Sequence, residues 1–133
     1  MRLLLEKEQT APDEGKIILD VDQGADYSEQ FLLTDENGPL DMTGCVFKFG
    51  ARYSLLDKRA AIGATCTPLG DGILELVLPS KITAQLRADN PDSEYNRLYF
   101  DVLKIKDNKA SQVIRGEIHV TPGSAHREAV LTT

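Results

Sequence analysis

Short runs in which apolar and polar residues alternate make up most of this chain, and turn residues separate them. A period of two is typical of strands that bury one face. Clear examples of this period are residues 17–22, 73–78 and 112–121. Turns such as Gly70-Asp71-Gly72 between such runs indicate antiparallel β-structure. The pattern therefore predicts an all-β protein.

The number and spacing of these runs suggest a more specific architecture. We expect an antiparallel, immunoglobulin-like β-sandwich of about seven strands. The predicted strands are residues 16–22, 27–34, 45–53, 63–68, 73–78, 97–106 and 112–121. One short helical turn is expected at residues 80–86, with Ser80 as its N-cap and with Ile82 and Leu86 on one face.

The apolar positions of these runs define a predicted core. Its members are Ile17, Leu19, Val21, Phe31, Leu33, Val46, Phe47, Phe49, Leu74, Leu76, Leu78, Leu86, Phe100, Val102, Ile114, Ile118 and Val120. Cys45 and Cys66 are expected to act as small buried apolar residues with free thiols, because no secretion signal precedes them.

The periodic region spans residues 15–122, which we interpret as a single domain between two less regular ends. Residues 123–133 are predicted to be a flexible tail, and residues 1–14 an N-terminal arm or edge strand. Leu3, Leu4 and Leu5 make the tip of this arm apolar, so they are candidate protein-interface residues. Folding of the arm onto its own sheet is the alternative.

Charge restricts the classes of partner. The chain of 133 residues has a net charge of -6, whereas proteins that wrap nucleic acid or bind anionic lipid need clustered cations. No apolar run approaches the length of a membrane span or of a signal peptide. We therefore expect no nucleic-acid or membrane partner, and synthesis in the cytoplasm.

Candidate reactive residues do not form a recognisable constellation. Asp20, Asp22 and Asp26 do not have the spacing of a calcium loop, so turn capping is the preferred interpretation. His119 and Glu117 are expected on the solvent face of the last strand, and His126 lies in the tail. No serine has a Gly-x-Ser-x-Gly context. We assign no catalytic, cofactor or metal residues and expect a non-enzymatic protein.

The turn motifs follow one another in a characteristic order. They are Gln-Gly-Ala-Asp-Tyr (23–27), Thr-Asp-x-x-Gly-Pro-Leu-Asp-Met-Thr-Gly (34–44), Gly-Asp-Gly-Ile-Leu-Glu-Leu-Val-Leu-Pro (70–79), Thr-Ala-x-Leu (83–86), Tyr-Phe-Asp-Val (99–102) and Arg-Gly-Glu-Ile-His-Val-Thr-Pro (115–122). In this order they resemble the small β-sandwich proteins of tailed phages and prophages, including the N-terminal domain of baseplate upper proteins. The resemblance covers residues 15–122.

This resemblance implies a structural or assembly subunit of a virion, in the baseplate, tail, neck or capsid decoration. Such a subunit is made in the bacterial host cytoplasm and binds copies of itself or other virion proteins. A carbohydrate- or receptor-binding module is the alternative, for which Tyr27, Tyr95 and Tyr99 are the available aromatic residues. A small hydrolase ranks last.

Overall fold

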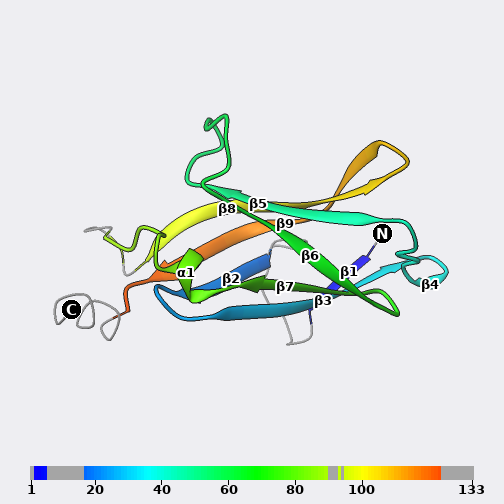
Figure 1. Cartoon of the computed structure of the whole chain (residues 1–133), viewed down its shortest axis with the longest axis horizontal. Coiled ribbons are helices and arrows are strands. Elements are labelled where there is room, and N and C mark those ends of the chain that lie inside the picture. The colour runs from blue at the N-terminus through cyan, green and yellow to red at the C-terminus, as the bar shows by residue number, and fades with distance from the viewer. Residues whose placement is uncertain (1, 6–16, 90–92, 94, 124–133) are drawn as a thin grey trace.

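Nearly all of the regular secondary structure in the described residues is β-strand, as the sequence predicts. The computed structural model describes residues 2–5, 17–89, 93 and 95–123 (Figure 1). Its elements are β1 (Arg2–Leu5), β2 (Ile17–Asp22), β3 (Tyr27–Asp35), β4 (Gly38–Pro39), β5 (Val46–Arg52), β6 (Ile62–Gly70), β7 (Ile73–Leu78), α1 (Ser80–Thr83), β8 (Asn96–Lys106) and β9 (Lys109–Thr121). The short β1 and β4 take the strand count to nine, beyond the predicted seven. Residues 1 and 6–14 of the predicted arm and 124–133 of the predicted tail lie outside the described residues.

The strands form one curled sheet in the order β1-β3-β7-β6-β5-β8-β9-β2, with β4 paired to β3. The curl passes through β6. Its first part, Ile62 to Cys66, pairs with β5, whereas Thr67 to Gly70 pairs with β7 and has an irregular register. Side chains from both halves of the sheet therefore meet in a single core between the two layers seen in Figure 1.

One pair of strands departs from the predicted antiparallel arrangement. β2 runs parallel to β9, with Leu19 beside Ile118 and Val21 beside Val120, so the sheet is mixed. The reason lies in the connection that follows β2. The chain turns at residues 22–26 and enters β3 in the other half of the sheet, so β2 has no hairpin partner of its own.

The core agrees closely with the alternating pattern. Every predicted core residue is buried except Val46, which is 46% exposed. Val46 precedes Phe47 in β5, and adjacent strand residues point to opposite faces, so only one of them can face the core. The buried apolar residues outside the predicted core are Leu40, Met42, Ala51, Ala88 and Leu98, together with Cys66, whose burial was expected separately. Cys66 is buried, while Cys45 is half-buried, and both thiols are free as predicted.

Two of the turn motifs interlock at one end of the sheet. Thr83 is fully buried; its hydroxyl donates to the carbonyl of Ala25 at 2.8 Å and accepts from the N–H of Gly24 at 3.1 Å. Gln23 donates through its side chain to the carbonyl of Leu86 at 2.9 Å. The motifs 23–27 and 83–86 therefore form one clamp beneath α1.

The predicted N-cap of the helix, Ser80, is wrong. Ser80 is the first residue of α1, and Pro79 occupies the N-cap position without a side-chain hydrogen bond. The carboxylate of Asp26 accepts from the Ser80 N–H at 2.7 Å instead. The sequence rule for helix caps considers only the residues next to the helix, so it could not predict a cap from a distant turn.

A second clamp joins the turns at the opposite end. The N–H of Leu33 donates to the carbonyl of Gly72 at 2.8 Å, and the N–H of Leu40 donates to the carbonyl of Leu33 at 2.9 Å. Gly72 has a φ of +78°, and a Cβ there would lie 2.5 Å from the Leu33 carbonyl oxygen. Glycine is therefore required where the β6–β7 turn touches β3 and β4.

Candidate interaction surface

The outward face of β5, β8 and β9 carries the polar positions of these strands. The outward residues of β8 and β9 are Arg97, Tyr99, Asp101, Arg115, Glu117 and His119. The register places Arg97 opposite His119, Tyr99 opposite Glu117, and Asp101 opposite Arg115. Side chains far apart in the sequence thus meet on one outer face.

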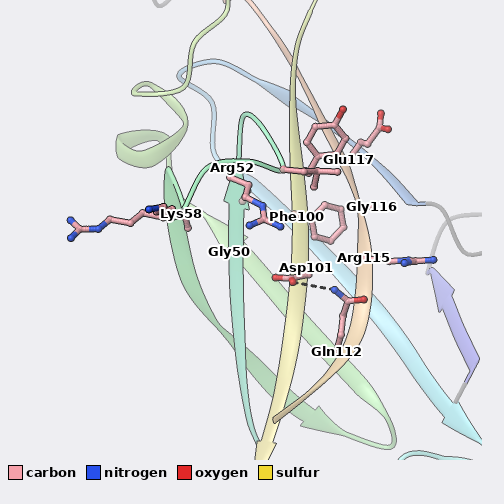
Figure 2. A pocket seen from close by; sticks show the side chains of 14 residues that line it. Gly50, Arg52, Lys58, Phe100, Asp101, Gln112, Arg115, Gly116 and Glu117 are labelled. Atoms are coloured by element: carbon pink, nitrogen blue, oxygen red, sulfur yellow. Dashed lines mark hydrogen bonds between the residues drawn. The ribbon is translucent and has the colours of Figure 1, made fainter.

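A groove crosses this face beneath the β5–β6 loop (Figure 2). It encloses about 510 Å³, within the usual range of ligand sites. Gly50 contributes no side chain on β5, and a Cβ there would reach the methyl of Ala60 at 3.6 Å. The loop therefore lies close over β5, and the groove opens between this loop and β9.

Cationic side chains surround the groove. Arg52, Lys58, Arg59 and Arg115 line it, against the acidic Asp101 and Glu117. Figure 2 shows Arg52 at the centre, with Lys58 and Arg115 on its opposite sides. Asp101 accepts a hydrogen bond from Gln112 at 3.1 Å. Within the described part of the chain, none of the four cations has a carboxylate at ion-pair distance.

The loop over the groove is held by its own polar contacts. The N–H of Ser54 donates to the Asp57 carboxylate at 3.1 Å, and Arg52 donates to the Asp57 carbonyl at 3.3 Å. Despite this internal order, Leu55 is 61% exposed and Leu56 is 91% exposed. Burying a leucine side chain stabilises a protein by about 1.5–3 kcal/mol relative to leaving it in water. The ordered loop leaves two leucines without this stabilisation.

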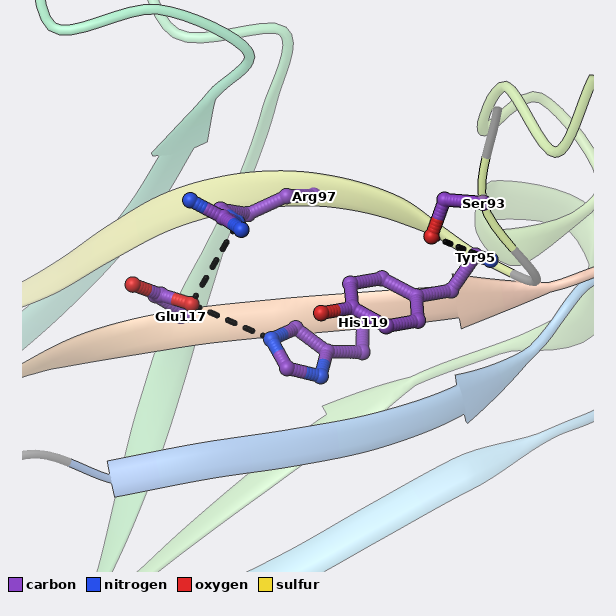
Figure 3. A network of polar contacts seen from close by, with 5 residues as sticks. All are labelled: Ser93, Tyr95, Arg97, Glu117 and His119. Atoms are coloured by element: carbon purple, nitrogen blue, oxygen red, sulfur yellow. Dashed lines mark hydrogen bonds and ion pairs between the residues drawn. The ribbon is translucent and has the colours of Figure 1, made fainter. Parts of the chain in front are cut away.

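Beside the groove, a polar network covers the end of β9 (Figure 3). Oε1 of Glu117 lies 3.5 Å from Nε of Arg97 and 3.1 Å from Nε2 of His119. The ring of Tyr95 stacks on His119 at 4.0 Å between centroids. Hydrogen bonding with Tyr99 and Tyr95, together with the charge of Glu117, raises the pKa of Arg97.

This network corrects the expectation that Glu117 and His119 face solvent. They lie on the predicted outer face, but their side chains are only 11% and 14% exposed. Tyr95 covers one face of the imidazole, and the carboxylate occupies its Nε2 edge. A histidine held in this way orders the surface, whereas a general base needs an open approach for its substrate.

The structure places the candidate interface residues on its own sheet. Leu3, Leu4 and Leu5 belong to β1, whose backbone pairs with β3 so that Leu3 lies opposite Leu33. The backbone of residues 2–5 therefore folds onto the protein's own sheet, which was the alternative to an interface with a partner. A role for these leucines in binding a partner stays a prediction.

The other candidate residues are dispersed. Asp26 caps the start of α1, which confirms a capping role for this residue, whereas Asp22 accepts a hydrogen bond from the Thr121 hydroxyl of the neighbouring strand at 2.7 Å. His126 lies outside the described residues. No group of three or more potential metal ligands occurs in the part of the chain that the structure describes. In that same part, no helix has the length and apolar character needed to cross a membrane.

The groove and the network were not predicted from the sequence. Alternation assigns Arg97, Tyr99 and Asp101 to one face of β8, but it does not say which residues of β9 lie opposite. A bulge between Val102 and Leu103 shifts the register of the hairpin by one residue. A register extended from the turn without this bulge would therefore pair the residues beyond Val102 with the wrong partners.

Comparisons with known proteins add no assignment. The chain matches no model of a protein family, and it matches no curated protein.

Proposed function

We propose that this protein is a non-enzymatic structural or assembly subunit of a tailed-phage or prophage virion. The observation that carries the proposal is the groove beneath the β5–β6 loop, where an ordered loop exposes Leu55 and Leu56 beside cations that have no carboxylate partner among the described residues. Exposed apolar side chains on a rigid module are typical of protein–protein contacts.

The order of turn motifs supports the virion setting. The motifs 23–27 and 83–86 form one clamp, and residues around 34–44 and 70–79 form the other. Motifs that carry the resemblance thus contact one another and fix the turns at both ends of the sheet. We further propose that the curled sheet is a variant of the immunoglobulin-like sandwich in which β2 has become a parallel edge strand.

The proposed partners are other proteins, including copies of this chain. The net charge of -6 disfavours association with nucleic acid or anionic membranes. The subunit would be made in the host cytoplasm and incorporated into the virion there.

Particles purified from a lysate of the producing strain test this proposal. Quantitative mass spectrometry should find the chain in several copies per particle, at a constant ratio to the major capsid protein through successive density gradients. A chain that stays in the soluble fraction while intact particles sediment would overturn the proposal.

A second candidate, a carbohydrate- or receptor-binding module, is favoured by one feature of the groove. Tyr99, Asp101 and Gln112 line it together, and an aromatic ring with hydrogen-bonding neighbours suits a sugar. A glycan array should then show binding that Tyr99→Ala removes and Tyr27→Phe retains. An array without a hit would reject this candidate.

A further inference from the structure

The groove and the two turns of the second clamp have complementary charge and lie in different halves of the molecule. In Figure 1 the β5–β6 loop rises from the left half, whereas β4 and the β6–β7 turn form the right-hand end. The groove is cationic through Arg52, Lys58, Arg59 and Arg115. The turns expose Glu36 and Asp71.

These turns lie side by side, and the backbone of Arg2 in β1 lies opposite Thr34 next to them. The Gly72 carbonyl binds the N–H of Leu33, so the β6–β7 turn is fixed beside the β3–β4 turn. Residues 31–47 and 60–80 contain neither lysine nor arginine. Asp41 is set apart because Lys106 lies near enough to help lower its pKa, after the stronger effect of its hydrogen bonds with Thr43.

We propose that the groove of one copy receives the acidic turns of a second copy, in a head-to-tail contact. This inference rests on the proposed assembly function and names the partner of the groove. The occupant is a second copy because the chain itself supplies both charges. Four of its 15 lysine and arginine residues line the groove, whereas each of the two turns exposes an acidic residue.

The contact has the elements of a specific interface. Lys58 and Arg115 would pair with Glu36 and Asp71, while Leu55 and Leu56 at the loop tip would lose their exposure against the neighbour. Because the two surfaces differ, the contact is heterologous, and its repetition produces a ring or a filament. Such growth suits a subunit present in many copies.

Two complementary variants test this contact. The groove variant combines Lys58→Glu with Arg115→Glu, and the turn variant combines Glu36→Lys with Asp71→Asn. Asparagine is chosen because residue 71 has a φ of +52°, a conformation that asparagine tolerates. Lys81→Glu on α1 is the control for a reversed charge away from the groove.

Sedimentation velocity at low salt should show concentration-dependent assemblies for the wild type and for Lys81→Glu. Each complementary variant alone should be monomeric, with self-association weakened more than about tenfold because like charges face each other. An equimolar mixture should associate again, since the intact groove of the turn variant then meets the intact turns of the groove variant. Unchanged melting temperatures verify the fold of each variant.

Specific results would overturn the inference. A wild type that stays monomeric at all concentrations rejects the self-contact, as does a mixture that stays monomeric, or variants that assemble like the wild type. Added oligonucleotide or poly-glutamate that binds the groove of a monomeric wild type would assign the groove to another polyanion. None of these results affects the presence of the chain in purified particles, which tests the proposed function separately.

Discussion

At the scale of single residues, Thr83 shows how much of this fold depends on one buried hydroxyl. It joins α1 to the turn after β2, although the two segments are far apart in sequence. Thr83→Val keeps the shape but leaves the Ala25 carbonyl and the Gly24 N–H without this partner. We expect a loss of about 1–3 kcal/mol in the free energy of unfolding.

Chemical denaturation measures this loss, and Ser80→Ala is the matched control. Ser80 is exposed on the same helix, so its substitution should change stability by less than about 0.5 kcal/mol. Equal stability of the two variants would show that Thr83 is not a clamp residue.

Glu117 gives a second prediction at this scale. A surface glutamate tolerates substitution, but this carboxylate is nearly buried and contacts both Arg97 and His119. Glu117→Gln should therefore cost about 1–3 kcal/mol. Denaturant midpoints compared with those of Glu36→Gln, an exposed control, measure the difference. Equal midpoints for Glu117→Gln and the control would show that Glu117 is exposed to solvent and does not stabilise the fold.

The cysteines provide a prediction that depends on pH. Burial raises the pKa of the Cys66 thiol from 9.0 to about 11, whereas Cys45 is half-buried. In native protein at about pH 8, iodoacetamide should label Cys45 first, because the reactive thiolate of Cys66 is disfavoured. Intact mass should show two added groups only after denaturation. Rapid labelling of both thiols in native protein would contradict the burial of Cys66.

The same shift predicts the direction of the alkaline response. Because the pKa of Cys66 is higher in the folded than in the unfolded state, its contribution to stability is complete below about pH 9 and is lost as the pH rises toward about 11. Burial and the nearby Glu29 raise the pKa of Tyr27, which acts in the same direction. Urea midpoints should therefore fall across this window, and a rise would contradict the assignment.

At the scale of elements, the β8–β9 hairpin shows what the sequence could and could not predict. Alternation assigned both strands and their buried faces, but β9 begins at Lys109 rather than at residue 112, because the turn is only Asp107 and Asn108, both with positive φ as a tight hairpin requires. The bulge after Val102 leaves no comparable pattern in the sequence. The cross-strand pairs, and hence the groove and the polar network, therefore required the structure.

Other differences have a similar cause. The parallel pairing of β2 depends on where the chain goes after Asp22, which hydrophobic periodicity does not report. The Asp26 cap and the Thr83 clamp join segments that only the tertiary fold brings together. Local patterns thus predicted the strands and the core, whereas long-range contacts decided the sheet order and the interaction surface.

Gly116 tests the parallel pairing directly. A Cβ at this position would collide with the Ile17 carbonyl oxygen in β2 and with the Phe100 ring in β8. Gly116→Ala should destabilise the protein by about 1–3 kcal/mol. Hydrogen exchange should show the loss in β2 and β9.

Gly50→Ala is the matched control, because its Cβ would meet only Ala60 at an ordinary 3.6 Å. We expect a change within about 0.5 kcal/mol. If Gly116→Ala were equally neutral, β2 would not lie against β9 as described.

At the scale of the whole molecule, rigidity and uneven charge together explain how this chain could build an assembly. The two clamps fix the ends of the curled sheet, so the groove and the acidic turns keep a constant separation. A constant separation lets a head-to-tail contact repeat with one geometry. Screening by salt should weaken such a contact, because its charged groups lie at the surface.

Cross-linking between copies can detect the proposed contact of the groove with the acidic turns. A mixture of ordinary and heavy-isotope protein is treated with a carbodiimide, which joins a lysine to a carboxylate in direct contact. Lys58 is the lysine of the groove, so we expect mixed-isotope peptides that join Lys58 to Glu36 or Asp71. Mixed-isotope links that consistently join other surfaces, or links from Lys58 found only within one copy, would contradict this contact.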